Sequence, residues 1–339
     1  MKCTNKWRML LIPLLAAGLL CFGCGEDIEI ENPYDIGVSA TNMGLTADDS
    51  EASETAKEEL EQSDLTFFAD GLCVAPEEQT SSEAVSDEVV EAIGVFLPAD
   101  GTITYQKNIY EKLYPASTTK IMTAYLALTK AGADDVVKVS EHAVDQASDS
   151  SVCGLRAGDE IKMSDLLYGL MLKSGNDAAV AVAEHVSGSE EAFVELMNET
   201  ARSFGATNTH FANPHGLHDE NHYTCVYDLY LIFSHAIELD GFLKLIQTTS
   251  YTTYYTHADG SQGSQAWTNT NRYLSGEVTQ PEGLTVIGGK TGTTNAAGNC
   301  LVLLSNNAKK EPVISIILKS DTRDNLYYVM NQVLGNFTK

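Results

Sequence analysis

The chain has 339 residues, of which 43% are hydrophobic and 20% are charged. This composition supports a buried core and excludes collagen-like, coiled-coil and wholly disordered chains. The formal net charge of −26 would repel a phosphate backbone, which argues against nucleic acid as a partner. Twenty acidic residues and one lysine, Lys57, lie between Glu26 and Glu91, so most of the acidity belongs to one N-proximal segment.

The first 24 residues have the pattern of an export signal. Lys2, Lys6 and Arg8 precede a 15-residue apolar run, Met9 to Gly23, which is short for a membrane span but suits a secretory signal. The run ends at Cys24, and this junction resembles the processing site of bacterial lipoproteins. We therefore expect residues 1–24 to be a signal peptide of the lipoprotein type, with Cys24 lipidated and the chain held at the membrane by that lipid. Simple signal cleavage and a free secreted protein are the alternative.

Residues 25–63 are rich in Glu, Asp, Ser, Thr and Ala and contain few aromatic residues. Such a segment cannot bury enough apolar surface to offset the entropy of ordering, so we expect a disordered, self-repelling linker. It would connect the membrane to a globular part over residues 64–339. A solvating tail without a tethering role is the alternative.

Four cysteines besides Cys24 remain after the signal, namely Cys73, Cys153, Cys225 and Cys300. They are far apart and form no Cys-x-x-Cys pair, so a zinc site is unsupported and no disulfide pairing can be deduced. We expect most of them to be small buried side chains.

In the globular part, the apolar pattern predicts strands at both ends and helices between them. The runs 92–97 and 102–106 flank a Pro-Ala-Asp-Gly turn and predict a hairpin. Ser164 is the expected N-cap of a helix over 164–173. Further helices are expected over 117–131, 178–186, 190–204, 223–237 and 324–337, and further strands over 251–256, 285–289, 300–305 and 313–319. This order indicates an α+β fold, with one sheet built from both termini and a helical lobe beside it.

Ser117 and Lys120 open the first of these helices. Because residues three apart share a helix face, the Lys120 amine can lie against the Ser117 hydroxyl. A serine is a weak nucleophile until a base removes its proton, and a desolvated lysine at a buried helix start can be that base. The helix N-terminus also offers backbone N–H groups to a developing oxyanion. Alone, the pair proves little, because a capping serine beside an exposed lysine gives the same pattern.

Two further segments strengthen the interpretation. Ser174-Gly175-Asn176 falls in a break between two helices, where a polar turn can direct side chains into a cleft. Lys290-Thr291-Gly292 follows two glycines at the end of a strand, and its glycine permits close approach of a ligand. Ser-x-x-Lys, Ser-x-Asn and Lys-Thr-Gly in this order, separated by about 55 and about 115 residues, are the combination of the penicillin-recognising serine enzymes.

Longer segments around these motifs closely resemble the D-alanyl-D-alanine carboxypeptidases, which are the low-molecular-mass penicillin-binding proteins. Residues 114–123 read Tyr-Pro-Ala-Ser-Thr-Thr-Lys-Ile-Met-Thr, and residues 165–170 read Asp-Leu-Leu-Tyr-Gly-Leu. Residues 174–179 read Ser-Gly-Asn-Asp-Ala-Ala, and residues 213–217 read Asn-Pro-His-Gly-Leu. The likeness extends from about Leu65 to the end of the chain. It implies a β-lactamase/transpeptidase-like fold, in which an antiparallel sheet is flanked by helices and the active site lies between the sheet and a helical lobe.

The resemblance implies a nucleophile, a base and a proton relay. Ser117 would attack the carbonyl between the two D-alanines of a peptidoglycan pentapeptide, with Lys120 as the base and Ser174 as the relay. D-alanine would leave, and water would hydrolyse the acyl-enzyme. β-Lactam antibiotics would inhibit the enzyme by acylating Ser117. No metal and no cofactor are implied.

The resemblance also implies the residues that bind the substrate. Asn176 would hydrogen-bond its amide, Lys290 would add positive potential, and Thr291, followed by Gly292, would bind the terminal carboxylate. The backbone N–H groups of Ser117 and Thr293 would form the oxyanion hole. An extra cation often binds the carboxylate in this family, and the candidates here are Lys319 and Arg323.

The chain departs from the family pattern in two places. Thr293 stands where some members carry histidine after Lys-Thr-Gly, so a hydroxyl replaces an imidazole beside the site. The sequence ends at Lys339, where many members continue into a β-rich domain and an anchoring helix. This ending favours the N-terminal lipid as the anchor, at the outer face of the bacterial cytoplasmic membrane.

The alternative functions are a D,D-endopeptidase, a β-lactamase and a silent sensor. A peptidoglycan D,D-endopeptidase would use the same residues. A class A β-lactamase needs a Glu-x-x-Leu-Asn loop between the second and third motifs, and only Glu195-Leu196-Met197-Asn198 is present, with the wrong spacing. A silent sensor of β-lactams or cell-wall peptides would lack the nucleophile or the base, and both are present.

A group of histidines could suggest a metal site. His215, His218, Asp219 and His222 lie close together, but their spacing matches no metal-binding helix pattern. We expect no metal there.

Overall fold

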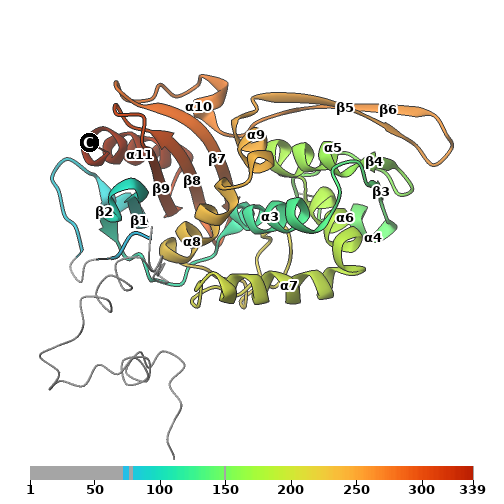
Figure 1. The fold of residues 1–339 in the computed structure, drawn as a ribbon, viewed down its shortest axis with the longest axis horizontal. Helices are drawn as coiled ribbons and strands as arrows, with labels where there is room; N and C mark the ends of the chain where they lie inside the picture. Colours follow the sequence, from blue (N-terminus) through green and yellow to red (C-terminus); the bar gives the residue numbers. More distant parts are fainter. Residues whose placement is uncertain (1–71, 76–78, 149, 339) are drawn as a thin grey trace, which may run out of the picture. The chain divides into compact units, whose positions relative to one another are not determined.

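The computed structural model describes residues 72–75, 79–148 and 150–338, all within the second of two units, Phe67–Lys339. The expected signal peptide (1–24) with Cys24 and the expected linker (25–63) lie outside the described residues. Within the described part, strands from both ends of the chain form one sheet and the middle of the chain is mainly helical, as expected for an α+β fold (Figure 1).

The central sheet has five antiparallel strands in the order β2-β1-β9-β8-β7. These strands are β1 (Val90–Leu97), β2 (Thr102–Lys107), β7 (Thr285–Thr294), β8 (Gly298–Asn306) and β9 (Pro312–Ser320). β1 pairs with both β2 and β9, so the predicted hairpin forms and the two ends of the globular part meet in one sheet. β8 and β9 are buried along almost their whole length, which explains their continuous apolar runs.

Helices cover both faces of this sheet (Figure 1). Because side chains alternate between the faces along a strand, Ile93 of β1 packs with the closing helix α11 (Arg323–Phe337), whereas Phe96 faces α8 (Val226–Ile237). The Phe96 ring stacks on that of Tyr230 in α8, with 4.1 Å between the ring centroids. The sheet therefore contributes to two separate cores, one on each face.

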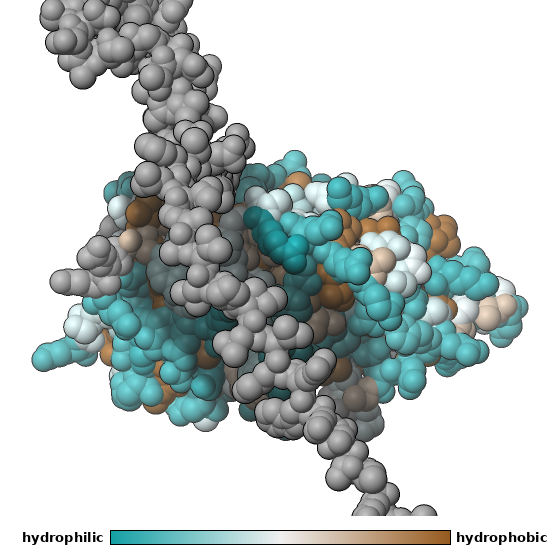
Figure 2. Space-filling model, turned by 90° about the horizontal axis from the view of Figure 1, so that it is seen from below, coloured by the Kyte–Doolittle hydropathy of each residue, from teal (hydrophilic) through white to brown (hydrophobic). Residues whose placement is uncertain are grey.

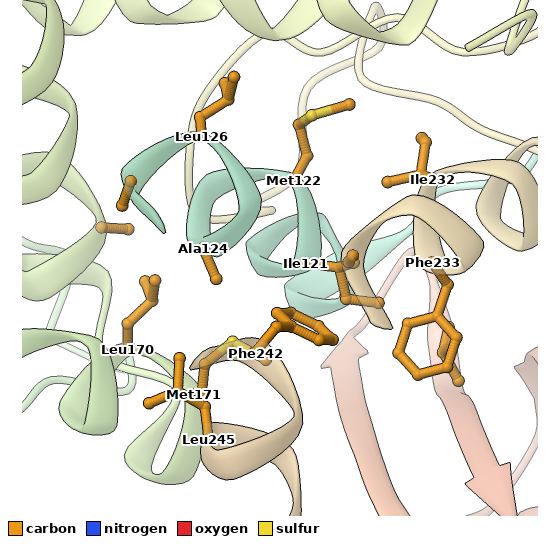
Figure 3. Close-up of a cluster of buried hydrophobic side chains, with 14 of the residues drawn as sticks. Ile121, Met122, Ala124, Leu126, Leu170, Met171, Ile232, Phe233, Phe242 and Leu245 are labelled. Carbon is orange, nitrogen blue, oxygen red and sulfur yellow. The ribbon is translucent and has the colours of Figure 1, made fainter. Parts of the chain in front are cut away.

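The helical region is built around α3 (Lys120–Lys130). The other helices here are α4 (Glu141–Val144), α5 (Met163–Tyr168), α6 (Asn176–Ser187), α7 (Glu190–Ser203) and α9 (Asp240–Gln247). Residues Lys120 to Ala124 are all buried, so the first part of α3 is enclosed on every side, whereas Thr129 and Lys130 at its end are exposed. Figure 3 shows its side chains pointing toward apolar residues of α8, α9 and the turn before α6. Each fully buried Leu, Ile or Met contributes about 1.5–3 kcal/mol, which makes α3 a rigid support.

A second sheet, which sequence analysis did not predict, has the order β3-β4-β5-β6. Its strands are β3 (Val136–Lys138), β4 (Glu160–Lys162), β5 (Ser250–Thr256) and β6 (Gln262–Thr268). The strand expected over 251–256 is β5 and pairs with β6 and β4, so its expected place in the sheet built from both termini was wrong. β6 is largely polar in sequence, and its signal is the pairing with β5 rather than an apolar run. Figure 1 shows β5 and β6 as a long ribbon that extends beyond the helices.

The N-cap predicted at Ser164 is also wrong. Helix α5 already begins at Met163, directly after β4, so Ser164 is its second residue. The amide N–H groups of Met163 and Ser164 donate to the carbonyl oxygens of Asp135 and Ala133, at 2.8 and 3.0 Å. Backbone carbonyls from the loop before β3 thus replace a capping side chain. The expected helix over 164–173 continues past α5 as a π-helical turn, η4 (Gly169–Lys173).

The surface and the cysteines agree with a globular domain. Cys73, Cys153, Cys225 and Cys300 are buried, as was expected for most of them, and all four are free. Hydrophobic residues are interspersed with hydrophilic ones on the face in Figure 2. Among the described residues, none of the helices has both the length and the apolar character needed to cross a membrane.

Candidate active site

Ser117 lies in a single 3-10 turn, η3 (Ala116–Thr119), which runs directly into α3. Ala116 has a φ of 48°, in the left-handed region that residues other than glycine rarely adopt. A backbone conformation of this kind persists only where the surrounding structure holds it. The turn that carries Ser117 is therefore shaped by its neighbours.

Two glycines from distant parts of the chain pack against this turn. A Cβ atom at Gly216 would lie 1.9 Å from the carbonyl oxygen of Ala116, and one at Gly292 would lie 2.9 Å from the amide nitrogen of Ser117. Only glycine lets two backbones approach this closely. The sequence predicted that Gly292 would allow a ligand to approach closely. In the structure, Gly292 packs against the turn that carries Ser117, and this contact places β7 beside Ser117.

Lys120, the first residue of α3, is fully buried, and its Nζ atom has three neighbours. It lies 3.1 Å from Ser117 Oγ, 2.8 Å from Asn176 Oδ1 and 2.6 Å from the carbonyl oxygen of His215. Burial, reinforced by the nearby positive charge of Lys290, holds the pKa of Lys120 well below its usual value. This shift favours the neutral, proton-accepting form of the amine.

The three neighbours determine how a neutral amine must be oriented. Neutral Lys120 has two N–H bonds and one lone pair, and two of its neighbours are carbonyl oxygens that can only accept. The two N–H bonds are directed at Asn176 and His215, so the lone pair faces the Ser117 hydroxyl. This is the arrangement of a general base with its nucleophile.

Ser174 and Lys290 form a second buried pair in the site. Ser174 ends η4 with a φ of 62°, in the break between helices that sequence analysis predicted. Its Oγ atom accepts a hydrogen bond of 2.9 Å from Lys290 Nζ on β7, and Nζ also donates to the carbonyl oxygen of Thr291 at 2.9 Å. Burial lowers the pKa of Lys290 to about 7.

The motif residues that follow Lys290 lie on β7, an edge strand of the central sheet within the described part of the chain. The Thr291 hydroxyl is 2.6 Å from that of Thr270, which follows β6. The Thr293 hydroxyl donates to Asn299 Oδ1 on β8 at 3.2 Å. The structure thus brings all eight predicted site residues of the globular part to one place: Ser117, Lys120, Ser174, Asn176, Lys290, Thr291, Gly292 and Thr293.

Asp177 supports this site, and sequence analysis gave it no role. Its buried carboxylate accepts backbone hydrogen bonds from Cys153 at 2.8 Å, Gly154 at 3.1 Å and Ala178 at 2.8 Å. These bonds attach the start of α6, and with it Asn176, to the loop at 151–155. The available signal was an acidic residue directly after Ser-Gly-Asn, at the start of a predicted helix.

The Asn-Pro-His-Gly-Leu segment also gains a function from the structure. The side chain of Asn213 accepts from the backbone N–H of Gly216 at 2.7 Å, which closes the loop on itself. This loop presents the His215 carbonyl to Lys120 and the Gly216 backbone to the nucleophile turn. Burial lowers the pKa of the His215 imidazole to about 3, so that ring stays neutral. Among the described residues no group of His, Cys, Asp and Glu is arranged to hold a metal.

The two candidate extra cations differ in their surroundings. Lys319 has a φ of 57° at the end of β9, where the β8–β9 register shifts, and its amine lies 3.4 Å from Glu91 Oε2. It lines a pocket of about 270 Å³ together with Tyr114, three residues before Ser117. Arg323 instead opens α11. None of the eight predicted site residues lines this pocket, and its lining includes Glu111 and Glu220, so it favours neither candidate.

Comparisons with known proteins agree with this geometry. The family model of peptidase S11, described as D-alanyl-D-alanine carboxypeptidase, matches residues 85–322. The chain is 40% identical over 208 residues to the D-alanyl-D-alanine carboxypeptidase DacF of Bacillus subtilis, covering 59% of this chain and 50% of that protein. It is 34% identical over 256 residues to a D-alanyl-D-alanine carboxypeptidase of Streptomyces sp. K15, covering 71% of this chain and 85% of that protein.

A solved structure extends the likeness to the fold. The crystal structure of the Streptomyces K15 DD-transpeptidase matches with a TM-score of 0.66 at 29% identity, covering 75% of this chain and 98% of that one. The expected transpeptidase-like fold is therefore confirmed. The chain spans about half the length of several curated relatives that it matches.

Proposed function

This chain belongs to the peptidase S11 family of D-alanyl-D-alanine carboxypeptidases, and from that premise we propose that it removes the terminal D-alanine of peptidoglycan pentapeptide stems. The observation that carries the proposal is the position of the buried Lys120 amine. It lies 3.1 Å from the Ser117 hydroxyl, and its other two neighbours are carbonyl oxygens that can only accept hydrogen bonds. A serine in such a contact can form and release an acyl-enzyme.

In the proposed reaction, neutral Lys120 takes the proton of Ser117 while Oγ bonds to the carbonyl carbon between the two D-alanines. The backbone N–H groups of Ser117 and Thr293 stabilise the oxyanion. The C–N bond then breaks, and D-alanine leaves as an amine that receives a proton through the Ser174 hydroxyl. Water hydrolyses the ester and restores Ser117. The same attack opens a β-lactam ring, so β-lactam antibiotics would acylate Ser117 and act as inhibitors.

The remaining site residues are proposed to hold the substrate. Asn176 would hydrogen-bond the substrate amide, with Lys120 occupying its oxygen. Lys290 would supply positive potential, and Thr291, beside Gly292, would bind the terminal carboxylate through its hydroxyl. Lys319 or Arg323 would add the second positive charge that often binds the carboxylate in this family. Thr293 would act through its backbone, since its hydroxyl is directed at Asn299.

We further propose an envelope location with a lipid anchor. Peptidoglycan lies outside the cytoplasmic membrane, so an enzyme acting on it must be exported. Residues 1–24 would be the signal peptide, Cys24 would carry the lipid, and residues 25–63 would link the membrane to a catalytic domain over 64–339. The length of this linker would let the domain reach the wall from the outer face of the membrane.

A D,D-endopeptidase remains the second candidate function, because crosslink cleavage would use the same nucleophile and base. A class A β-lactamase is disfavoured, since Asn198 of the partial Glu-x-x-Leu-Asn match is engaged elsewhere. Its side chain donates to the Phe211 carbonyl at 2.8 Å and accepts from the Phe211 N–H at 2.8 Å. A silent sensor is disfavoured by the complete nucleophile and base.

The test is release of free D-alanine from a pentapeptide stem mimic by the purified protein, with Ser117→Ala as the control. Release by the wild type alone would support both the reaction and the nucleophile. Labelling of Ser117 by a fluorescent penicillin without release would point to the endopeptidase or to the sensor. Absence of both would contradict the proposed function.

A further inference from the structure

A buried histidine that has no part in the proposed reaction lies one hydrogen bond from the nucleophile turn. The Nε2 atom of His222 is 2.7 Å from the hydroxyl of Thr119, inside the Ser-x-x-Lys motif. That hydroxyl donates to the carbonyl oxygen of Ala116 at 2.8 Å. All three residues are about 1% exposed, so water does not compete for these bonds.

The direction of every proton in this chain of hydrogen bonds follows from its neighbours. The Nδ1 atom of His222 accepts from the backbone N–H of Ala212 at 3.0 Å, and a backbone N–H can only donate. The ring proton is therefore on Nε2, which donates to Thr119 Oγ1, and the Thr119 proton goes on to Ala116. Burial lowers the pKa of His222 to about 3, so the ring keeps this neutral form.

The Ala116 carbonyl has a direct geometric link to the oxyanion hole. In a trans peptide, the C=O of one residue and the N–H of the next point in opposite directions. The N–H opposite the Ala116 carbonyl belongs to Ser117, which is the expected oxyanion donor. Gly292 on β7 lies against this nitrogen, so the Ser117 amide is next to the strand that carries Thr293.

We propose that His222 and Thr119 are positioning residues of the oxyanion hole, which orient and polarise the peptide between Ala116 and Ser117. Their hydrogen bonds hold the carbonyl of the left-handed Ala116 away from the site and so direct the Ser117 N–H into it. A hydrogen bond accepted at the carbonyl also strengthens the N–H of the same peptide as a donor. This role depends on the proposed function in one respect: the reaction at Ser117 must pass through a tetrahedral oxyanion.

The test uses paired substitutions in the full chain. Thr119→Val and His222→Phe keep the approximate shape but remove the hydrogen bonds, whereas Thr119→Ser and His222→Gln keep a hydroxyl and a donor. Thr224→Val is the matched control, because Thr224 is a fully buried threonine whose hydroxyl bonds Thr209 instead of the nucleophile turn. The rate of acylation by a fluorescent penicillin is measured, together with the fraction labelled at completion and the affinity for a peptide boronic acid, which forms a tetrahedral adduct.

Complete loss of one oxyanion donor lowers turnover about 10²–10³-fold. Misorientation of the donor should cost less, and we expect the two disrupting variants to acylate roughly 10- to 100-fold more slowly. Boronic acid affinity should fall by a similar factor, while the labelled fraction stays complete. Thr119→Ser, His222→Gln and Thr224→Val should stay within a factor of about 3 of the wild type, and the double disruption should resemble either single one.

Three results would overturn the positioning role. One is wild-type acylation in Thr119→Val, and another is a rate loss explained by a smaller labelled fraction, which would mean a structural role alone. The third is an equal rate loss in Thr224→Val. If the wild type is labelled by penicillin but releases no D-alanine, the carboxypeptidase proposal fails while the positioning role is still decided by these rates. If the wild type is not labelled at all, both fail.

Discussion

Replacing Asp177 by Asn tests whether the buried carboxylate beside the Ser-Gly-Asn motif organises the active site. The two carboxylate oxygens have separate partners. Oδ1 accepts from the N–H groups of Cys153 and Ala178, both at 2.8 Å, and Oδ2 accepts from those of Gly154 at 3.1 Å and Leu155 at 3.4 Å. An Asn side chain can keep the first pair through its oxygen, but its NH₂ group would face two N–H donors in place of Oδ2.

The expected cost follows from this exchange. A hydrogen bond to a charged group contributes about 1.5–3 kcal/mol, and a buried donor left without an acceptor costs about 1–3 kcal/mol. The contact with Leu155 N–H is long, so the main loss is the hydrogen bond from Gly154 N–H. We expect Asp177→Asn to lower the free energy of unfolding by about 2–4 kcal/mol. The loop at 151–155 would then release the start of α6. Since Asn176 starts that helix and holds Lys120, the rate of acylation should fall as well.

The assay combines urea denaturation with the rate of acylation by a fluorescent penicillin. Asp228→Asn is the matched control, because Asp228 is equally buried and its Oδ2 accepts from Asn208 N–H and the Thr209 hydroxyl, both at 2.7 Å. Because both of these partners are on one oxygen, an Asn amide oxygen can keep them, so this variant should lose less stability and keep its acylation rate. A free energy of unfolding in Asp177→Asn within about 0.5 kcal/mol of the wild type would refute the hydrogen-bond argument. An equal rate loss in Asp228→Asn would refute the link to the site.

Other predictions concern charge, packing and the second sheet. Because burial lowers the pKa of Lys290 to about 7, its charge is present below that pH and lost above it. The KM for an anionic peptide should therefore rise as the pH passes through 7, and Lys290→Arg should remove this rise; a flat wild-type KM would contradict it. Gly216→Ala should abolish penicillin labelling, since its Cβ would lie 1.9 Å from a backbone oxygen, and normal labelling would count against the packing argument. Trp267→Phe should reduce the free energy of unfolding by about 1 kcal/mol in urea titrations, because the indole N–H donates to the Cys153 carbonyl at 3.2 Å.

The reactive residues were predictable because their signals are local. Ser117 and Lys120 are one helical turn apart, and the break at Ser174 follows from the polarity of three successive residues. The central strands were predictable from continuous apolar runs. In each case a short window of sequence carries the physical cause of the structure.

The supports of the site were missed because their causes lie far away in the sequence. The bond between Thr119 and His222 joins residues 103 positions apart. Likewise, β6 exists through its pairing with β5, and the start of α5 uses carbonyls from the loop before β3 instead of Ser164. No local pattern contains this information. The resemblance to a family predicted which residues meet, but it gave no reason for their orientation.

The burial of Lys120 connects the stability of the fold to its chemistry. A lysine acts as a base only when neutral, and at neutral pH this requires a pKa far below that of an exposed amine. Burial without a carboxylate partner produces this shift but costs stability, and within the described part of the chain neither Lys120 nor Lys290 forms an ion pair. The base is the first residue of α3, and the residues that follow it, Ile121 to Ala124, are all buried. The apolar packing around the following residues of α3, shown in Figure 3, thus helps to offset the cost of desolvating the base.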